Sequence, residues 1–290
     1  MSCSKKTVVV TGATSGIGFA AADLLAGQGM RVFLVGHAMD RCKAARQKLL
    51  ASHPDADIAC FAGDLVHQRE VLRVAAEIRE KLARDYSGEL FGLVNNAGCV
   101  RSWYMTSDEG YEQQFALNHL AGFLMALELL PELKKAAGRV LFTASQSHRF
   151  IKMRWNDLML QRGYNPLLAY KQSKLCNLLT AHEFNRRFGG SGVTFQCVDP
   201  GLVNTGIGCK DTGYLVNSIW SARRKKGREP EVPARTYLYL LGNERREGLY
   251  FGDCAAKRYS REVNDKNAQR LYEISAKLCG VGGVGAEESV

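Results

Sequence analysis

The sequence predicts a single α/β domain with a doubly wound parallel sheet of about seven strands and helices on both faces. Two observations lead to this prediction. Short apolar segments rich in β-branched residues alternate along the chain with segments of helical composition, and this alternation is typical of βαβ units. Polar or glycine-rich residues follow five of the predicted strands, as expected where ligands bind beyond the carboxyl ends of parallel strands.

The expected elements follow one another from the N-terminus. Strands are predicted at residues 7–10, 31–35, 58–62, 139–144, 193–198 and 249–251, and a further strand ends at Leu93-Val94. Helices are predicted at residues 19–28, 38–51, 67–84, 111–135 and 168–188. The domain is expected to cover residues 1–279, and the small, glycine-rich segment 280–290, which ends acidic, is expected to be a disordered tail.

Length and composition limit the class of protein. The chain has 290 residues, is 46% hydrophobic and contains six prolines, which suits one large core without a linker. No apolar stretch is long enough for a signal peptide or an integral membrane segment. The nine cysteines contain no Cys-x-x-Cys pair, so neither a metal site nor a disulfide framework is expected, and a cytoplasmic protein is predicted.

The formal net charge of +10 is compatible with nucleic acid, acidic lipid or a phosphorylated ligand. The densest basic run is Arg223-Arg224-Lys225-Lys226-Gly227-Arg228. It contains no interleaved aromatic residues, so it is interpreted as a solvated surface loop, and a nucleic-acid binder is the less favoured hypothesis.

The first predicted strand runs into a glycine-rich loop, Thr11-Gly12-Ala13-Thr14-Ser15-Gly16-Ile17-Gly18, that opens the first predicted helix. Free N–H groups at a helix N-terminus bind phosphate, and glycines permit a close approach. Because strand, loop and helix occur in this order, the loop is predicted to bind the pyrophosphate of a dinucleotide in a Rossmann-type fold rather than to form an ordinary turn.

The end of the second predicted strand reads Val35-Gly36-His37-Ala38, and no acidic residue occurs before Asp40. A carboxylate there would bind the ribose 2′-hydroxyl of NAD, whereas a basic residue accommodates the 2′-phosphate of NADP. His37 and Arg41 therefore favour NADP(H) as the cofactor, with NAD(H) as the alternative. His37 would otherwise be a solvent-exposed strand end.

A catalytic pair is predicted in the helix that contains Tyr170-Lys171-Gln172-Ser173-Lys174. Their separation places Tyr170 and Lys174 on one face of the helix. An ammonium group and an oxidised nicotinamide both favour the phenolate, so Tyr170 can exchange a proton with a carbonyl or alcohol oxygen. Lys174 would also hold the nicotinamide ribose, and Ser145, after the fifth strand, would donate a hydrogen bond to the same substrate oxygen.

Taken together, the glycine loop, Asn95-Asn96-Ala97-Gly98, Ser145, Tyr170 with Lys174, and Pro200-Gly201 resemble in order the motifs of the short-chain dehydrogenase/reductase family, along the chain to about Leu278. The resemblance implies a catalytic tetrad of Asn118, Ser145, Tyr170 and Lys174, in which Asn118 relays protons through water. It also places Asp64 beside the adenine and Thr205 at the nicotinamide carboxamide. The expected cofactor contacts are Gly12, Thr14, Ser15, Gly16, Ile17, Gly18, His37, Arg41, Asp64, Leu65, Asn96, Ala97, Gly98, Tyr170, Lys174, Pro200, Gly201, Val203 and Thr205.

The interval from Ser145 to Tyr170 and the segment from Gly248 to Leu278 resemble the retinol dehydrogenase-like branch, which includes the oxidoreductase domain of WW-domain-containing oxidoreductase. NADP-using members of this branch usually carry Arg where this chain has His37. Relatives in the family also imply a homodimer or homotetramer. The expected activity is the interconversion of a carbonyl and an alcohol, and a non-catalytic nucleotide-binding regulator is the alternative.

Substrate contacts are expected in the segment 204–230, which would form a flap over the site. The stretch Tyr214–Trp220 within it suggests an apolar ligand such as a retinoid, a steroid or a lipid aldehyde or ketone. The alternative is that these residues pack on the domain and do not contact a ligand. Ser147 and His148 are candidates for the pocket wall, with an ordinary surface loop as the alternative.

Overall fold

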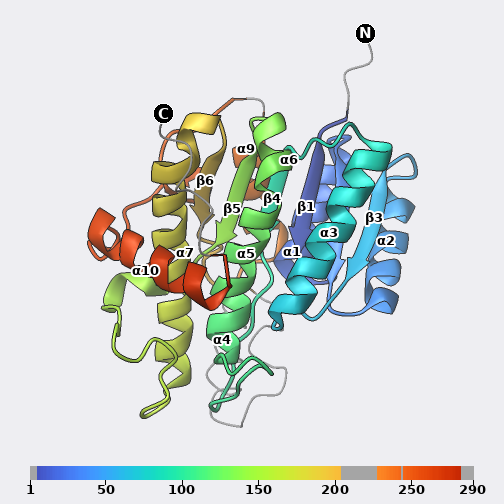
Figure 1. Cartoon of the computed structure of the whole chain (residues 1–290). Coiled ribbons are helices and arrows are strands. Elements are labelled where there is room, and N and C mark those ends of the chain that lie inside the picture. The colour runs from blue at the N-terminus through green and yellow to red at the C-terminus, as the bar shows by residue number, and fades with distance from the viewer. Residues whose placement is uncertain (1–4, 204–226, 243, 282–290) are drawn as a thin grey trace.

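The computed structural model describes residues 5–203, 227–242 and 244–281. Within them, one eight-stranded sheet has the order β3-β2-β1-β4-β5-β6-β7-β8, with helices on both of its faces (Figure 1). The strands are β1 (Thr7–Thr11), β2 (Arg31–Gly36), β3 (Ile58–Ala62), β4 (Gly92–Asn95), β5 (Arg139–Thr143), β6 (Thr194–Val198), β7 (Tyr250–Gly252) and β8 (Ala255–Ala256). The predicted doubly wound α/β fold is confirmed.

The helices cover the sheet in two layers. The α-helices are α1 (Gly16–Gly27), α2 (Met39–Ser52), α3 (Gln68–Asp85), α4 (Gln113–Phe115), α5 (Ala121–Glu128), α6 (Leu130–Lys135), α7 (Pro166–Phe188), α9 (Glu231–Leu240) and α10 (Asp265–Leu278). A π-helix, η1 (Ala116–Leu120), and two 3₁₀ helices, η2 (Gln146–Phe150) and η3 (Gly189–Ser191), complete the described elements. None of these helices is long and apolar enough to cross a bilayer.

Alternating side chains of the central strands build a core on each side of the sheet. Val8 and Val10 of β1 pack with residues of α1, α2 and α9, while Val9 packs with residues of α3, α5, α7 and α10. The period of two along a strand explains this division. Because both faces are covered, the strands consist almost entirely of apolar residues, which is why the sequence revealed them as continuous runs.

The strand order reverses between β1 and β4. Residues 8–10 of β1 pair in parallel with residues 92–94 of β4 on one side, and β1 pairs with β2 on the other. Chain connections therefore leave β1 and β4 in opposite directions, which opens a crevice at their carboxyl ends. The edge formed by the ends of β1, β4, β5 and β6 is the place where the fold offers a ligand site.

Three features differ from the sequence predictions. The predicted helix over residues 111–135 is divided into α4, η1, α5 and α6, and Leu129 separates the last two. Pro131, in the first turn of α6, lacks the N–H that a continuous helix would need. The strand β8 is short and pairs antiparallel with β7, and two residues are too few to produce an apolar pattern. The helices α9 and α10 were not among the predicted helices.

Some predictions concern residues that lie outside the described ranges. These are Thr205, most of the expected flap at 204–230, the basic run up to Lys226, and the expected tail from residue 282 onward.

Candidate active site

The glycine-rich loop lies against the loop that follows β4. Gly12 and Gly16 have φ angles of 65° and 55°, in the left-handed region. A Cβ atom on Gly12 would lie 2.9 Å from the Cα atom of Ala97, and one on Gly18 would lie 2.5 Å from Nδ2 of Asn96. The Gly18 Cβ atom would lie nearer still, at 2.3 Å, to the carbonyl oxygen of Gly12. Side chains at these two glycines are therefore excluded by the loop after β4 and by the glycine-rich loop itself.

Thr11, the last residue of β1, connects the glycine-rich loop to the loop that follows β4 through hydrogen bonds. Its Oγ1 accepts hydrogen bonds from the N–H groups of Asn96 and Ala97, both at 3.0 Å. The side-chain amide of Asn96 in turn donates to the carbonyl of Thr11 at 3.1 Å. Sequence reasoning included Thr11 in the motif but gave it no role, because its partners lie more than 80 residues away.

The start of α1 has backbone N–H groups that its own cap leaves free. Ser15 is the N-cap residue with an extended backbone, and its side chain makes no capping hydrogen bond. The first N–H groups of a helix lack partners within the helix, and they attract an anion. Together with the glycine turn, this terminus fits the pyrophosphate of a dinucleotide. Thr14 lies in the turn, and a Cβ atom on Gly36 would lie 2.6 Å from its Cγ2.

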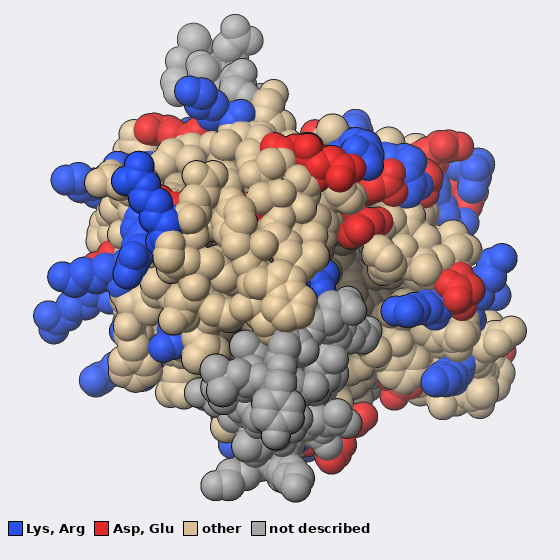
Figure 2. Space-filling view, turned by 90° about the horizontal axis from the view of Figure 1, so that it is seen from below, with Lys and Arg blue, Asp and Glu red and all other residues tan. Residues whose placement is uncertain are grey.

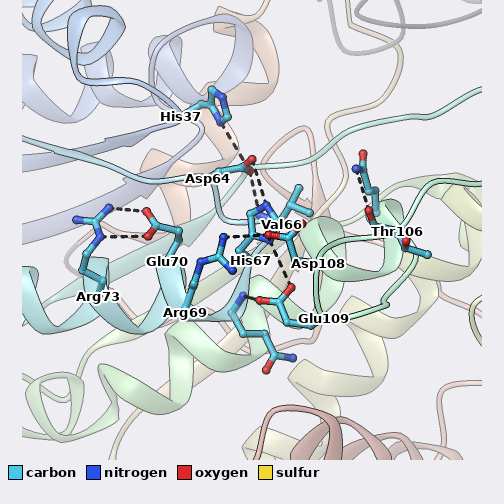
Figure 3. Close-up of polar contacts among 12 residues, drawn as sticks. His37, Asp64, Val66, His67, Arg69, Glu70, Arg73, Thr106, Asp108 and Glu109 are labelled. Carbon is cyan, nitrogen blue, oxygen red and sulfur yellow. Dashed lines mark hydrogen bonds and ion pairs between the residues drawn. The ribbon is translucent and has the colours of Figure 1, made fainter.

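At the end of β2, the two residues expected to face the adenosine lie side by side. Nδ1 of His37 is 3.6 Å from Oδ1 of Asp64 (Figure 3). The His37 side chain is 66% exposed, and Arg41, in the first turn of α2, is exposed as well. Asp64 is oriented by the N–H of Val66, which donates to its Oδ1 at 3.2 Å. Leu65, between them, is buried.

His67 connects this region to the long loop after β4. Its Nε2 is 3.9 Å from Oδ2 of Asp64, and its Nδ1 lies 3.6 Å from Oδ2 of Asp108 and 3.4 Å from Oε2 of Glu109 (Figure 3). Glu109 also accepts a hydrogen bond from the N–H of Gln68, the first residue of α3, at 2.9 Å. This cluster holds the β4 loop against α3. It escaped sequence reasoning because the contributing segments are about 40 residues apart.

Three predicted catalytic residues converge beneath Gly98. Lys174 is 2% exposed, and its Nζ donates to the carbonyl of Thr143 at 3.0 Å and lies 5.6 Å from the centroid of the Tyr170 ring. A Cβ atom on Gly98 would lie 3.0 Å from Oδ1 of Asn118 and 3.6 Å from Nζ of Lys174. Burial lowers the pKa of Lys174 to about 8, because a low-dielectric surrounding disfavours the ammonium form.

Asn118 lies in the π-helix η1, where one additional residue widens the turn. Its Oδ1 accepts from the N–H of Cys99 at 2.7 Å, and its Nδ2 donates to the carbonyl of Cys99 and to Oγ of Ser173, both at 3.0 Å. The side-chain amide is therefore fully engaged with the loop after β4 and with α7. Burial raises the pKa of the neighbouring Cys99 thiol to about 12, so this thiol stays protonated at neutral pH.

Ser145 follows β5 and caps the 3₁₀ helix η2. Its Oγ accepts hydrogen bonds from the N–H of Ser147 at 3.3 Å and from the hydroxyl of Ser147 at 3.1 Å. Because Ser147 donates in both bonds, the hydroxyl hydrogen of Ser145 remains free to be donated to a ligand. Ser147 therefore orients the serine, a more specific position than the pocket wall expected from the sequence.

Asp199 joins the loop of Ser145 to the Pro200-Gly201 segment. Its carboxylate is buried, and Oδ1 accepts from the N–H groups of Gln146 at 3.3 Å and Gly201 at 3.0 Å. Gly201 has a φ angle of 68°. Val203, further along, forms a parallel bridge with Arg228. Asp199 was missed, although it directly precedes the Pro-Gly pair, because an acidic residue at a strand end has many structural uses.

His148 is buried and ties the Ser145 loop to the C-terminal part of the chain. Its Nδ1 lies 2.6 Å from the carbonyl oxygen of Ser145, and its Nε2 accepts from the N–H of Ser260 at 3.3 Å. A carbonyl only accepts and an N–H only donates, so the ring is neutral with its hydrogen on Nδ1. Burial lowers the pKa of His148, in agreement with this state. His148 is thus a fixed support beneath the serine loop.

The sheet edge therefore carries a helix N-terminus without a side-chain cap, a strand end with His37 and a buried lysine beside a tyrosine. This arrangement defines a dinucleotide-dependent oxidoreductase. Residues 6–212 match the sequence model of the family described as short chain dehydrogenase. The chain belongs to this family, and it is a NAD(P)-dependent dehydrogenase that acts on CH–OH groups.

Similar proteins indicate the branch. The chain is 34% identical to mouse (Mus musculus) retinol dehydrogenase 12 over 283 residues, which covers 95% of this chain and 87% of that protein. It is also 34% identical to human (Homo sapiens) retinol dehydrogenase 13, with coverages of 95% and 85%. These similarities confirm the retinol dehydrogenase-like assignment.

Solved structures agree on the fold. An uncharacterised protein from Mycobacterium paratuberculosis superposes with a TM-score of 0.71 at 26% identity, covering 96% of this chain and 94% of that one. A short-chain dehydrogenase from Sphingobium yanoikuyae superposes with a TM-score of 0.64 at 22% identity, covering 84% and 86%.

Proposed function

We propose that this protein is an NADP(H)-dependent oxidoreductase that interconverts a carbonyl and an alcohol on an apolar substrate. In this proposal Asn118, Ser145, Tyr170 and Lys174 are the catalytic residues. The observation that carries it is the convergence of Lys174 and Asn118 beneath Gly98, with the Tyr170 ring beside the Lys174 ammonium. A bound nicotinamide would donate or accept the hydride at the substrate carbon.

The protein's own part of the reaction is the movement of one proton at the substrate oxygen. Tyr170 donates this proton during reduction and accepts it during oxidation. Lys174 favours the phenolate through its positive charge, and its position is held by the Thr143 carbonyl. Ser145 donates its free hydroxyl hydrogen to the same oxygen, where negative charge develops during reduction.

The contacts of the Asn118 side chain limit the role that it can have in the reaction. Both ends of its side-chain amide are occupied by Cys99 and Ser173. A relay of protons through water would therefore run along the main chain of the π-helix, and the side chain holds that turn in place. Asn118 thus acts as a positioning residue as well as a member of the tetrad.

Support for NADP(H) comes from the end of β2. His37 and Arg41 are exposed there, and no carboxylate occupies the strand end itself. Nδ1 of His37 lies 3.6 Å from Oδ1 of Asp64, which orients the ring at this strand end. A 2′-phosphate would be attracted by His37 and Arg41, whereas NAD(H) would lack its usual carboxylate partner. NAD(H) is the alternative cofactor.

Support for an apolar substrate comes from the loops at the same edge. Trp103, Phe150 and Leu202, which follow β4, β5 and β6, are 50%, 76% and 51% exposed. Exposed large apolar side chains at a ligand edge favour an apolar ligand. A retinoid, steroid or lipid aldehyde or ketone fits this edge, and two similar proteins are retinol dehydrogenases. A cytoplasmic location and a homodimer or homotetramer remain predictions.

The test is to titrate NADPH and NADH separately, by fluorescence, into wild type, His37→Ala and Tyr170→Phe. Wild type is expected to bind NADPH more tightly, and His37→Ala is expected to reduce that preference. Tyr170→Phe should keep its affinity for NADPH but lose turnover of apolar aldehydes by about 10²-fold to 10⁴-fold, the usual contribution of a general acid–base. Binding without any turnover by wild type would favour the nucleotide-binding regulator instead, and no binding would refute both.

A further inference from the structure

A cavity of about 230 Å³ lies at the active edge of the sheet, one residue beyond Ser145. Its walls are η2 on one side and the β7–β8 region on the other. The lining residues are Gln146, Arg149, Asp199, Tyr250, Lys257 and Arg258. The proposed reaction uses none of these side chains.

The cavity has an excess of positive charge. Asp199 is its one carboxylate, and Lys257 offsets that charge with Nζ 3.6 Å from Oδ2, while also pairing with Asp253 at 3.3 Å. Two backbone N–H groups bind the other oxygen of Asp199. Arg149 and Arg258 are exposed and form no ion pair within the described residues. Two guanidinium groups are therefore left to face an anion.

An unused donor lies in the wall between them. Tyr250 is 1% exposed, and its hydroxyl has no hydrogen-bond partner among the described residues. Burial and then the neighbouring Asp199 carboxylate raise the pKa of this phenol, so the hydroxyl keeps its hydrogen. Buried hydroxyl groups normally have partners, and a ligand oxygen in this cavity would supply one.

The two walls are joined rather than loosely apposed. His148 is bonded to Ser145 on one wall and to Ser260 on the other, and its ring packs edge-on against Tyr250 with centroids 5.0 Å apart. Lys257 adds a backbone bond from its N–H to the carbonyl of Tyr250 at 2.8 Å. The cavity is thus built by fixed contacts on both sides.

An open groove of about 650 Å³ continues from this cavity and shares Arg149 and Arg258 with it. It adds apolar surface from Phe150, Ile151 and Tyr259. It also adds the positive charges of Lys152 and Arg261, which outnumber its one carboxylate, Glu262. Figure 2 shows Lys and Arg projecting along the left side of the molecule, the side on which Figure 1 shows α10. Cationic and aromatic side chains together suit an amphipathic anion.

We infer that this cavity is an anion-binding subsite that receives the carboxylate or phosphate of an amphipathic ligand whose apolar part lies in the groove. Two sources supply such a group: an acidic group on the carbonyl substrate itself, or the headgroup of an anionic phospholipid. The first source rests on the proposed function, whereas binding of the anion does not depend on turnover.

The first experiment measures binding of octyl phosphate by calorimetry. The double variant Arg149→Gln/Arg258→Gln is expected to lose tenfold or more in affinity, and Tyr250→Phe about tenfold, as for hydrogen bonds to a charged group. The control Lys48→Gln/Arg235→Gln removes two exposed charges from α2 and α9, outside the cavity, and should bind as wild type does. Equal affinity in wild type and the arginine double variant would overturn the subsite. Thermal unfolding of each variant verifies that it is folded.

The second experiment separates the sources. If the substrate carries the anion, wild type prefers 8-oxooctanoate to octanal in kcat/KM, and the arginine double variant loses about tenfold of that preference. If a headgroup supplies it, wild type binds phosphatidylglycerol vesicles more than phosphatidylcholine vesicles, and the double variant loses the difference. Binding of octyl phosphate without turnover of either aldehyde would refute the proposed function and retain the subsite. Equal affinity of wild type and the arginine double variant for octyl phosphate overturns the subsite whatever the aldehyde and vesicle results are.

Discussion

The side-chain amide of Asn118 spans the backbone of Cys99: Oδ1 accepts from the Cys99 N–H at 2.7 Å, and Nδ2 donates to the Cys99 carbonyl at 3.0 Å. One side chain thereby satisfies both polar groups of a residue that directly follows the Asn95-Asn96-Ala97-Gly98 segment. The loop over the active edge is consequently anchored to the π-helix.

Replacement of Asn118 by Leu tests this anchor. The variant has a similar volume but leaves the Cys99 N–H and carbonyl without partners, so the free energy of unfolding should fall by about 2 to 4 kcal/mol. Asn118→Asp keeps an acceptor for the N–H but turns a carboxylate oxygen toward the Cys99 carbonyl, so it should be destabilised as well. Urea denaturation of the cofactor-free protein measures both. An Asn118→Leu protein as stable as wild type would contradict the anchoring role.

A second prediction concerns Gly18, where a Cβ atom would lie 2.5 Å from Asn96 Nδ2. The Cβ atom would also lie 2.3 Å from the backbone carbonyl oxygen of Gly12. Alanine is ordinarily favoured over glycine inside a helix by about 1 kcal/mol. We nevertheless expect Gly18→Ala to destabilise the fold by about 1 to 3 kcal/mol, because overpacking must displace the backbone of the glycine-rich loop, and to weaken dinucleotide binding. Gly190, around which the structure shows open space, provides the matched control: Gly190→Ala should change stability by less than about 0.5 kcal/mol. The proposed clash is wrong if both variants unfold at the same urea concentration.

Cofactor choice can be shifted at His37. A guanidinium binds phosphate with more donors and stays charged at all working pH values, so His37→Arg should increase the affinity for NADPH relative to NADH by about fivefold to tenfold. His37→Glu should reverse the preference, since a carboxylate at this strand end repels the 2′-phosphate and accepts from the ribose 2′-hydroxyl. Separate fluorescence titrations measure each ratio. If both variants keep the wild-type ratio, His37 does not face the 2′-phosphate.

The burial of His119 leads us to expect a lower free energy of unfolding in acid. It is fully buried, its Nε2 lies 2.8 Å from Oγ of Ser275, and burial lowers its pKa to about 3. An unfolded imidazole takes up a proton below about pH 6.5 whereas the folded one does not. Acidification therefore stabilises the unfolded state, and the unfolding free energy should fall by about 2 kcal/mol from pH 6.5 to about pH 5. His119→Gln should flatten this part of the pH profile. If His119→Gln has the same pH profile as wild type, His119 takes up its proton in the folded protein as readily as in the unfolded protein.

The sequence was sufficient for the fold and the family because their signals are local. Three successive valines before a glycine turn indicate a buried strand, and the spacing of Tyr170 and Lys174 places them on one helix face. The structure adds the contacts between distant segments, such as Thr11 with Asn96 and His148 with Ser260. The spacing of residues in the sequence does not predict such contacts, because each partner considered alone is an ordinary polar residue.

Helix interruptions were equally hard to foresee. Residues 111–135 have a composition suited to one continuous helix, and only Pro131 signals a break. The π-helix at Ala116–Leu120 has no sequence mark, because its wider turn depends on the contacts of Asn118 with Cys99 and Ser173. Tertiary contacts outweigh local helix propensity at this position.

The same π-helix makes the chain unusually sensitive to changes in length. A π-turn holds one more residue than the α-turn it replaces, so losing one residue between Ala116 and Leu120 would restore a regular helix. The flanking helical segments would nearly keep their orientation, because the π-turn holds its additional residue within one turn, but the wider turn that presents Asn118 to Cys99 would be lost. A point substitution in this turn removes the contacts of one side chain. Deletion of a single codon would remove the contacts of Asn118 with Cys99 and Ser173 together and displace the loop over the active edge.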